Sequence, residues 1–395
     1  MYIEKLDNKG RGITYKNNKI TFVENALEGE DVEIKITNEK AKYNEAIVVK
    51  YNNLSKDRSE VKCPYYDYCG GCDLLHFKYK KELEFKKKKV MDILKKFGGI
   101  EFKINNIISP VEYNYRNKAT FQVKEKVGYY GKKSYNIINI DNCLIVDERI
   151  NDILRRIKKL NLKNIYQLII RVSQNDSMLI IKCDNDIDNR FKELNLTSII
   201  MFKNKKYEVI KGQDYIIEVL GNLKFIISPD SFFQVNTCGA VELYNKVLEY
   251  SNLTGTEKVL DLYCGTGTIG LFLSKCAGEV VGVEINRSAI NDALKNKKLN
   301  YIENIEFICD DASNINLSEF DLIIVDPPRK GIDQKTINYL LNSGSKKIIY
   351  VSCDPVTLAR DLKKLKEKYE VKDITLVNMF SKTEHCESVV LLYNK

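Results

Sequence analysis

Among the eleven cysteines of this 395-residue sequence, Cys353 lies where a catalytic nucleophile would be useful. It follows an apolar run, residues 347–352, that is typical of a buried strand, and it precedes Pro355, a residue favoured in the first turn of a helix. Ligands of open α/β sheets bind at the carboxyl ends of the strands, and the helix dipole favours a thiolate near a helix N-terminus. We therefore predict that Cys353 faces a ligand crevice as a reactive thiolate.

Four acidic residues end neighbouring predicted strands in the same part of the chain: Asp261, Glu284, Asp311 and Asp326. The first strand is followed by a turn with two glycines, Gly265 and Gly267, which lets a ligand approach the backbone at a helix N-terminus. Glu284 lies at the spacing where a carboxylate reaches ribose hydroxyls, and Asp311 is suited to an adenine edge. Four acids without a three-glycine fingerprint favour a cationic sulfonium cofactor, which has no diphosphate, over NAD.

The elements that position these residues alternate between strands and helices after Pro229, which predicts a parallel, doubly wound α/β sheet. Seven strands are expected, at residues 258–262, 280–284, 305–309, 322–326, 347–352, 374–379 and 388–393. If the last strand runs antiparallel, it begins at the edge where the parallel strands end. Glu387 would then share a crevice with Cys353, whereas Glu384 lies four residues before that strand.

The residues before Pro229 are mostly β in character. Five short strands, at 2–6, 12–15, 20–23, 32–36 and 45–49, are separated by turn residues and predict a small closed barrel of OB type. Further strands are expected at 119–124, 168–172, 179–182 and 224–227, with a helix near 147–160. We expect a barrel at 1–53, a central α+β domain at 54–228 and a catalytic α/β domain at 229–395.

Four short motifs occur in order along the chain: 231–236 (SFFQVN), 326–331 (DPPRKG), 352–355 (SCDP) with 359–361 (ARD), and 385–388 (HCES). Together they resemble the motifs of the RNA 5-methyluridine methyltransferases. The first fifty residues, with Gly10-Arg11-Gly12 and the run 26–30, resemble a TRAM domain, a small RNA-binding barrel. The resemblance covers essentially the whole chain and implies a Rossmann-like class I methyltransferase fold for the catalytic domain.

The resemblance implies covalent chemistry on uracil. C5 of uracil is a poor nucleophile until a thiolate adds to C6, and the family cysteine matching Cys353 makes this addition. The resulting enolate takes the methyl group of S-adenosylmethionine. Glu387 matches the general base that removes the C5 proton, after which elimination frees the cysteine. A TRAM-like barrel combined with a cysteine loop resembles the 23S rRNA branch more than the minimal tRNA enzymes, although cluster-bearing enzymes that act on tRNA leave that alternative open.

The resemblance also implies which residues contact the cofactor and the base. The cofactor site is expected to comprise Gln234, Tyr263, Gly265, Glu284, Asp311 and Asp326. Asp326 would also hold the uracil edge, and Phe232 would stack on the extruded base, which is how bases pulled from their neighbours are commonly held.

A second group of cysteines lies in a short glycine-containing loop. Cys63, Cys69 and Cys72 surround Gly70 and Gly71, so three thiolates could converge on one centre. Their spacing suits either zinc or a [4Fe–4S] cluster. The resemblance favours the iron–sulfur cluster and implies Cys143 as its fourth ligand. We expect a structural or RNA-docking role for this cluster, because methyl transfer requires no electron.

An amphipathic helix is predicted at 79–97, with apolar Leu83, Val90, Leu94 and Phe97 on one face and lysines on the other. Its lysines either contact RNA or are simply solvated, and the helix packs either on the catalytic domain or beside the cysteine loop.

The formal charge of +9 is a modest basic excess that fits a polyanionic partner. The sequence shows neither an apolar run of membrane-spanning length nor a signal peptide, so we expect a cytoplasmic protein that does not contact membranes. A monomer is the simplest expectation, although the sequence carries no signal for the oligomeric state.

Two functions of other classes are alternatives to RNA methylation. An iron–sulfur redox protein with a nucleotide-binding domain would also carry a cluster, but it would form no covalent complex with 5-fluorouridine RNA through Cys353. A non-catalytic iron–sulfur RNA-binding protein would not need to retain Cys353, Glu387 and Gln234 together.

Overall fold

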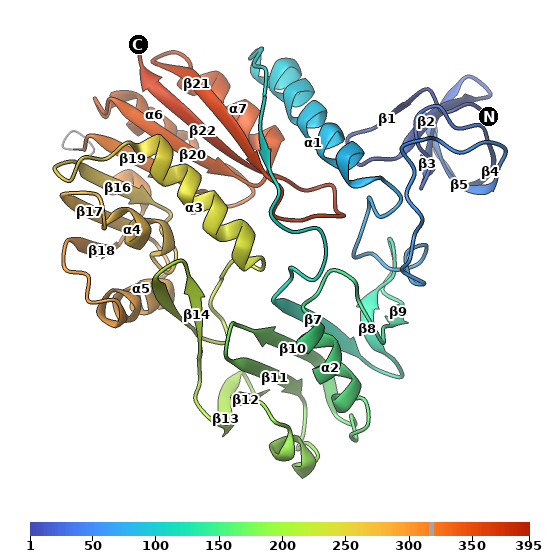
Figure 1. Ribbon diagram of the computed structural model, residues 1–395, viewed down its shortest axis with the longest axis horizontal. Coiled ribbons are helices and arrows are strands. Elements are labelled where there is room, and N and C mark those ends of the chain that lie inside the picture. The colour runs from blue at the N-terminus through green and yellow to red at the C-terminus, as the bar shows by residue number, and fades with distance from the viewer. Residues whose placement is uncertain (316–319) are drawn as a thin grey trace.

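The chain folds into an N-terminal barrel, a central region of strands and a C-terminal α/β region (Figure 1). The structure is a computed structural model that describes residues 1–315 and 320–395. No helix within those ranges combines the length and the apolar character that crossing a membrane requires.

The N-terminal barrel contains the five strands expected from the sequence. They are β1 (Lys5–Leu6), β2 (Gly12–Lys16), β3 (Lys19–Glu24), β4 (Val32–Glu39) and β5 (Tyr43–Tyr51), in the order β1-β2-β3-β5-β4. An antiparallel bridge between Tyr2 and Asp31 brings the N-terminus beside the start of β4 and closes the barrel. Alternate side chains, among them Ile3, Val23 and Val32, fill its small core.

The central region is a seven-stranded sheet with helix α2 (Glu148–Ile157) packed on it. Its strands are β7 (Lys118–Val123), β8 (Val127–Tyr130), β9 (Ile137–Asn139), β10 (Ile165–Val172), β11 (Ser177–Cys183), β12 (Ser198–Lys203) and β13 (Lys206–Lys211). The carboxylate of Asp147 caps α2 by accepting a hydrogen bond from the backbone N–H of Arg149. The apolar face of α2 then buries Ile150, Leu154 and Ile157 against the strands.

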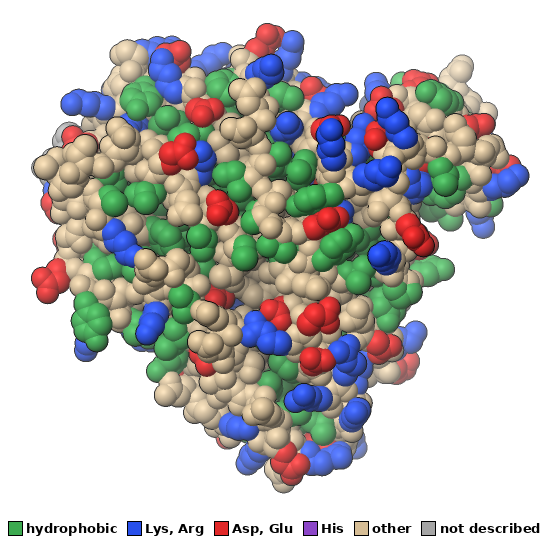
Figure 2. All heavy atoms as spheres, in the orientation of Figure 1, with side chains coloured by type: hydrophobic (Ala, Val, Ile, Leu, Met, Phe, Trp, Pro, Cys, Tyr) green, Lys and Arg blue, Asp and Glu red, His purple; other side chains and the backbone are tan. Residues whose placement is uncertain are grey.

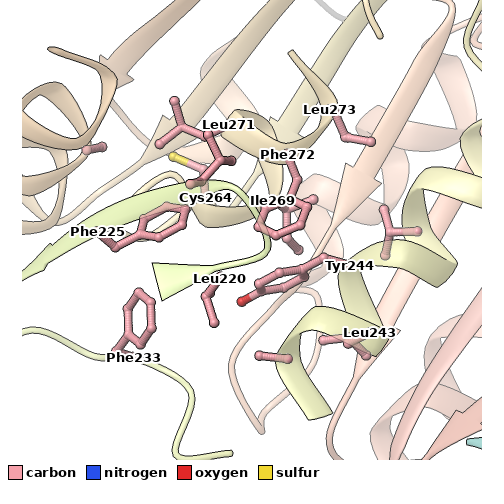
Figure 3. Close-up of a cluster of buried hydrophobic side chains, with 14 of the residues drawn as sticks. Leu220, Phe225, Phe233, Leu243, Tyr244, Cys264, Ile269, Leu271, Phe272 and Leu273 are labelled. Carbon is pink, nitrogen blue, oxygen red and sulfur yellow. The ribbon is translucent and has the colours of Figure 1, made fainter. Parts of the chain in front are cut away.

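A hairpin of β14 (Ile216–Leu220) and β15 (Leu223–Ile227) leaves the central sheet and packs on the C-terminal region. Figure 3 shows Leu220 and Phe225 of this hairpin grouped with Phe233, Tyr244 and side chains of helix α4 (Thr268–Leu273). Because burying one such aromatic side chain contributes roughly 1.5–3 kcal/mol, this cluster fixes the segment around Phe233 to the C-terminal sheet.

The C-terminal region is an eight-stranded sheet with the order β18-β17-β16-β19-β20-β22-β21-β6. Its strands are β16 (Lys258–Leu262), β17 (Glu279–Glu284), β18 (Ile305–Cys309), β19 (Leu322–Val325), β20 (Lys347–Ser352), β21 (Tyr369–Val377) and β22 (Glu387–Asn394). The prediction of seven strands was wrong by one, because β6 (Ile107–Ile108) adds a two-residue strand parallel to β21. β22 runs antiparallel to both of its neighbours, as predicted.

Helices cover both faces of this sheet. Its inner strands are therefore buried on each side, and their sequences are nearly continuous apolar runs. One face packs against α3 (Thr237–Ser251), α4 and α5 (Arg287–Leu299). The other packs against α6 (Gln334–Asn342), α7 (Pro355–Leu365) and helix α1 (Tyr79–Ile93).

Helix α1 packs on the catalytic sheet through Val90 and Ile93 and, through Phe85, on Leu74 just after the cysteine loop. Two expectations about this helix were wrong. A π-helical turn, Leu94–Gly98, follows α1 and changes the spacing from 3.6 residues per turn, so that Phe97 is exposed instead of joining the apolar face. Lys86, expected on the basic outer face, is fully buried. Gly98 fits close to α7, where an added Cβ would lie 3.1 Å from the carbonyl oxygen of Ala359.

Candidate active site

Cys353 lies between the end of β20 and the first turn of α7. The Asp354 carboxylate caps α7, accepting hydrogen bonds from the backbone N–H groups of Val356 and Thr357, each at 2.9 Å. Pro355 takes the first helical position. The thiol is therefore held at the helix N-terminus, at the carboxyl end of a parallel strand, where the sequence places it.

The expected thiolate at Cys353 does not follow from this position alone. Burial, together with the nearby carboxylates of Glu387 and Asp326, raises the pKa of the Cys353 thiol to about 11. The guanidinium of Arg329 acts in the opposite direction but is outweighed. The helix dipole, worth roughly 1 kcal/mol, favours the thiolate, whereas burial and the two nearby carboxylates favour the neutral thiol.

Glu387 begins β22 and lies at the same sheet edge as Cys353. Ser352 and Ser388 are directly paired across β20 and β22, so Cys353 and Glu387 extend from adjacent positions on neighbouring strands. Burial, together with the nearby carboxylate of Asp326, raises the pKa of Glu387 to about 8. Glu384 points elsewhere and forms an ion pair of 2.7 Å with Lys89.

Asp326 opens the DPPRKG loop, which is fastened to helix α7. Gly331 has a φ of +73°, and a Cβ there would lie 2.5 Å from the side chains of Arg360 and Asp361. One oxygen of the Asp361 carboxylate accepts hydrogen bonds from Ile332 N–H and the Tyr350 hydroxyl, both at 2.8 Å. Nη2 of Arg360 donates to the carbonyl of Lys330 at 2.9 Å. The ARD motif therefore holds the loop that carries Asp326 and Arg329.

The sequence analysis identified the ARD motif only through its resemblance to the family and predicted no role for Arg360 or Asp361. Asp361 is fully buried, and its two carboxylate oxygens are shared among the loop, the strand and Arg360. An acidic residue on the apolar face of a predicted amphipathic helix was the signal that could have identified it.

The glycine turn and Glu284 form the expected cofactor edge. One Glu284 oxygen accepts a hydrogen bond from Gly265 N–H at 3.3 Å, and the other accepts from Asn286 N–H at 2.9 Å. Tyr263 is half-buried at a φ of 63°, and its hydroxyl donates to Asp333 at 3.4 Å. Ile285, directly after Glu284, is 70% exposed. This bare apolar side chain at the ligand edge is a candidate contact that the sequence reasoning missed.

Two of the acids behave differently from the others. Asp261 is fully buried and accepts a hydrogen bond at 2.9 Å from the N–H of Gly270, in the first turn of α4, so it holds that helix rather than lining the crevice. Burial raises its pKa to about 8. Asp311 caps the short helix at Ala312–Asn314 through Ser313 N–H at 2.9 Å. One oxygen of Asp311 is therefore engaged in capping.

In the SFFQVN segment, one phenylalanine side chain points into the hydrophobic core and its neighbour points to solvent. Phe233 is 4% exposed and belongs to the core in Figure 3, whereas Phe232 is 78% exposed. Asn117 of the central region fixes the backbone beyond them, with its N–H donating to Val235 carbonyl at 2.8 Å and its side-chain amide to Gln234 carbonyl at 3.4 Å. Phe232 is thus the aromatic ring available to a ligand, and Gln234 is anchored beside it.

The cysteine loop opens into the same cavity as this segment. A cavity of about 560 Å³ is lined by Cys63, Cys69, Cys72 and Cys143 and also by Phe232, Arg329 and His385. All four thiols are free, and each is partly exposed. Within residues 1–315 and 320–395, however, no group of three or more Cys, His, Asp or Glu side chains has the geometry of a metal site. The structure thus brings the four cysteines to one cavity but does not show their convergence on one centre.

Two family models match the chain. One, described as tRNA (uracil-5-)-methyltransferase, matches residues 78–395, and the other, a TRAM domain, matches residues 2–49. An RNA methyltransferase of Clostridium tetani is 37% identical over 99% of this chain and 95% of its own length. Another, of Halalkalibacterium halodurans, is 34% identical over 99% of this chain and 95% of its own.

A solved structure shares the whole architecture. The tRNA (uracil-54, C5)-methyltransferase of Pyrococcus abyssi, in complex with S-adenosyl-L-homocysteine, superposes with a TM-score of 0.84 at 28% identity. The match covers 99% of both chains, barrel and central region included.

Proposed function

The chain belongs to the tRNA (uracil-5-)-methyltransferase family of S-adenosylmethionine-dependent RNA methyltransferases, and we propose that it methylates C5 of a uridine in 23S rRNA through a covalent bond from Cys353 to C6. The observation that carries this proposal is the pairing of Ser352 with Ser388, which brings Cys353 and Glu387 to one edge. A nucleophile and a base that reach the same bound ring are what addition to C6 followed by proton removal from C5 requires.

In the proposed reaction, Cys353 loses its proton to solvent and its sulfur adds to C6 of uracil, which turns C5 into a nucleophilic enolate carbon. That carbon takes the methyl group of S-adenosylmethionine, whose S–CH3 bond breaks to leave S-adenosylhomocysteine. The Glu387 carboxylate then takes the C5 proton, the C5–C6 double bond forms again and the Cys353 thiolate leaves. Phe232 stacks on the extruded uracil, and Asp326 holds its polar edge.

Six residues are proposed to hold the cofactor: Gln234, Tyr263, Gly265, Glu284, Asp311 and Asp326. The hydrogen bonds that Glu284 accepts from Gly265 and Asn286 fix its carboxylate at the glycine turn, in position for ribose hydroxyls. The exposed Ile285 is suited to pack against the adenine ring. The proposed domain limits are 1–53, 54–228 and 229–395.

A uridine in tRNA is the second candidate substrate. The P. abyssi enzyme that acts on uracil 54 of tRNA shares both the barrel and the central region, since the match covers 99% of each chain. The architecture is therefore compatible with either RNA. Mapping 5-methyluridine in 23S rRNA and tRNA from a strain that lacks this protein tests the choice: loss of a 23S rRNA site supports the proposal, and loss only from tRNA contradicts it.

We propose further that Cys63, Cys69, Cys72 and Cys143 hold a [4Fe–4S] cluster with a structural role. The chemistry of the donors suits such a cluster, because four free thiols line one cavity and none is engaged in a disulfide, but the side chains do not converge on one centre in this structure. Such a cluster would fasten the loop at 63–72 to the segment before α2, which contains Cys143. Protein purified without oxygen should contain iron and sulfide, and Cys69→Ser should lose both. Zinc in place of iron would contradict the proposal.

A further inference from the structure

The loop at residues 378–386 joins β21 to β22 and leads directly into Glu387, and it is held chiefly by segments outside the catalytic region. Three polar side chains of helix α1 and the residues after the cysteine loop bind its backbone. Many of these contacts are buried, where an unpaired charge or carbonyl is costly, so the arrangement admits little freedom.

Helix α1 provides the first set of contacts. Nζ of Lys86 donates to Oδ1 of Asn378 at 2.6 Å and to the carbonyl of Phe380 at 3.0 Å. Oε1 of Glu82 accepts from Lys86 Nζ at 2.8 Å and from Lys382 N–H at 2.9 Å. Glu82, Lys86 and Lys382 are all at most 1% exposed.

One turn further along α1, Nζ of Lys89 donates to the carbonyl of Glu384 at 3.0 Å. The sequence predicted that the lysines of this helix contact RNA or are solvated. Two of them, Lys86 and Lys89, instead bind the 378–386 loop within the protein. On the face in Figure 2, basic side chains gather where α1 meets the N-terminal barrel, with acidic ones among them, but Lys86 does not belong to that surface.

The segment after the cysteine loop provides the second set. The N–H groups of Asp73 and Leu74 both donate to Lys382 carbonyl at 3.0 Å. Asp73 Oδ2 accepts from Glu384 N–H at 3.2 Å. Lys382 itself has a φ of 65°, a left-handed conformation that a non-glycine residue keeps only where its surroundings impose it.

We propose that Glu82 and Lys86 are positioning residues for Glu387, so that α1 governs removal of the C5 proton without contributing to thiolate addition. This inference rests on the proposed function. Proton transfer requires the base within hydrogen-bond reach of its target, so a small displacement of the 378–386 loop slows that step. Cys353 is held separately, by β20 and the Asp354 cap.

The test compares Lys86→Met with Lys88→Met, an exposed position on the same helix. With ordinary RNA, Lys86→Met should turn over at least about tenfold more slowly and should accumulate a covalent protein–RNA species, because proton removal has become limiting. With 5-fluorouridine RNA, which has no C5 proton to remove, its rate of adduct formation should stay within about twofold of wild type. Lys88→Met should match wild type in both assays.

Tyr115→Phe provides a milder variant that only removes the hydrogen bond of 2.9 Å from the Tyr115 hydroxyl to Ser381 carbonyl. Its turnover with ordinary RNA should also fall, by less than in Lys86→Met, while its rate of adduct formation with 5-fluorouridine RNA should stay near the wild-type rate. Equal losses of both rates in Lys86→Met and in Tyr115→Phe, or unchanged turnover in both, would overturn the inference. Wild-type protein that forms no adduct with 5-fluorouridine RNA would instead refute the proposed function, and this inference with it.

Discussion

Ser352 and Ser388 are paired neighbours on the antiparallel strands β20 and β22. The residue after Ser352 is Cys353 and the residue before Ser388 is Glu387, so a single strand pairing brings the proposed nucleophile and base to one edge. The antiparallel final strand is what makes this possible, because a parallel strand would begin at the opposite edge of the sheet.

The ionisation of Cys353 gives the first prediction. Burial raises the pKa of this thiol to about 11, so the neutral form dominates at pH 7. Alkylation of Cys353 by iodoacetamide, followed by peptide mass spectrometry on the protein without cofactor, should accelerate roughly tenfold per pH unit between pH 7 and 9. A rate that levels off below pH 8 would show that a thiolate is already present.

The stability of the protein should depend on pH through Glu387. Its pKa in the folded protein is about 8, above the unfolded value of 4.5, so the folded state binds more protons between these values and loses stability as pH rises through that window. Replacing Glu387 by Gln removes this cost.

Urea denaturation should therefore show Glu387→Gln gaining stability over wild type from pH 5 to pH 8, by at least about 2 kcal/mol, since one pKa unit corresponds to about 1.4 kcal/mol. Glu370→Gln, at an exposed position of β21, serves as the control and should show no such trend. A constant difference between Glu387→Gln and wild type would mean that the carboxylate is not buried.

Gly331 should tolerate no side chain. Its φ is +73° and an added Cβ would meet Arg360 and Asp361 at 2.5 Å, whereas Gly344 has a φ of +72° with nothing within 4 Å. Gly331→Ala should therefore be less stable than Gly344→Ala by roughly 1–3 kcal/mol, the usual cost of overpacking, and should lose methylation. Equal thermal stability of the two variants would show that the loop is not fastened to α7.

Cofactor affinity should depend on Glu284. Its carboxylate is oriented by Gly265 and Asn286, and loss of a charged hydrogen-bond acceptor costs about 1.5–3 kcal/mol. Calorimetric titration with S-adenosylhomocysteine should give a Kd about ten- to a hundredfold higher for Glu284→Ala. Glu303→Ala, exposed and away from the crevice, should bind like wild type. An unchanged Kd for Glu284→Ala would remove this residue from the site.

The sequence predicted the strands of the barrel and of the catalytic sheet, because period-2 alternation and buried apolar runs are local signals. Features that depend on distant parts of the chain were not predictable in this way. The two-residue strand at Ile107–Ile108 carries no periodic signal, and the π-turn at Leu94–Gly98 breaks the spacing that placed Phe97 inside. Lys86 resembled a surface lysine because its partners Asn378 and Phe380 lie almost three hundred residues away.

The site was predictable to a similar degree. Strand ends placed Cys353, Glu284 and Glu387 at one edge from the sequence alone, but the raised pKa of Cys353 depends on burial and on carboxylates from other strands. The positioning roles of Asp261 and Asp361 are likewise tertiary, since each accepts a hydrogen bond from a backbone N–H of another element, Gly270 of α4 and Ile332 of the DPPRKG loop.

The central claim is that Cys353 forms the covalent bond to uracil. The most direct measurement incubates the protein with S-adenosylmethionine and 5-fluorouridine RNA and identifies the modified peptide by mass spectrometry. We predict a methylated 5-fluorouracil adduct on Cys353, and none in Cys353→Ser protein that still binds cofactor and RNA. An adduct on another cysteine, or methylation by Cys353→Ser near the wild-type rate, would contradict the claim.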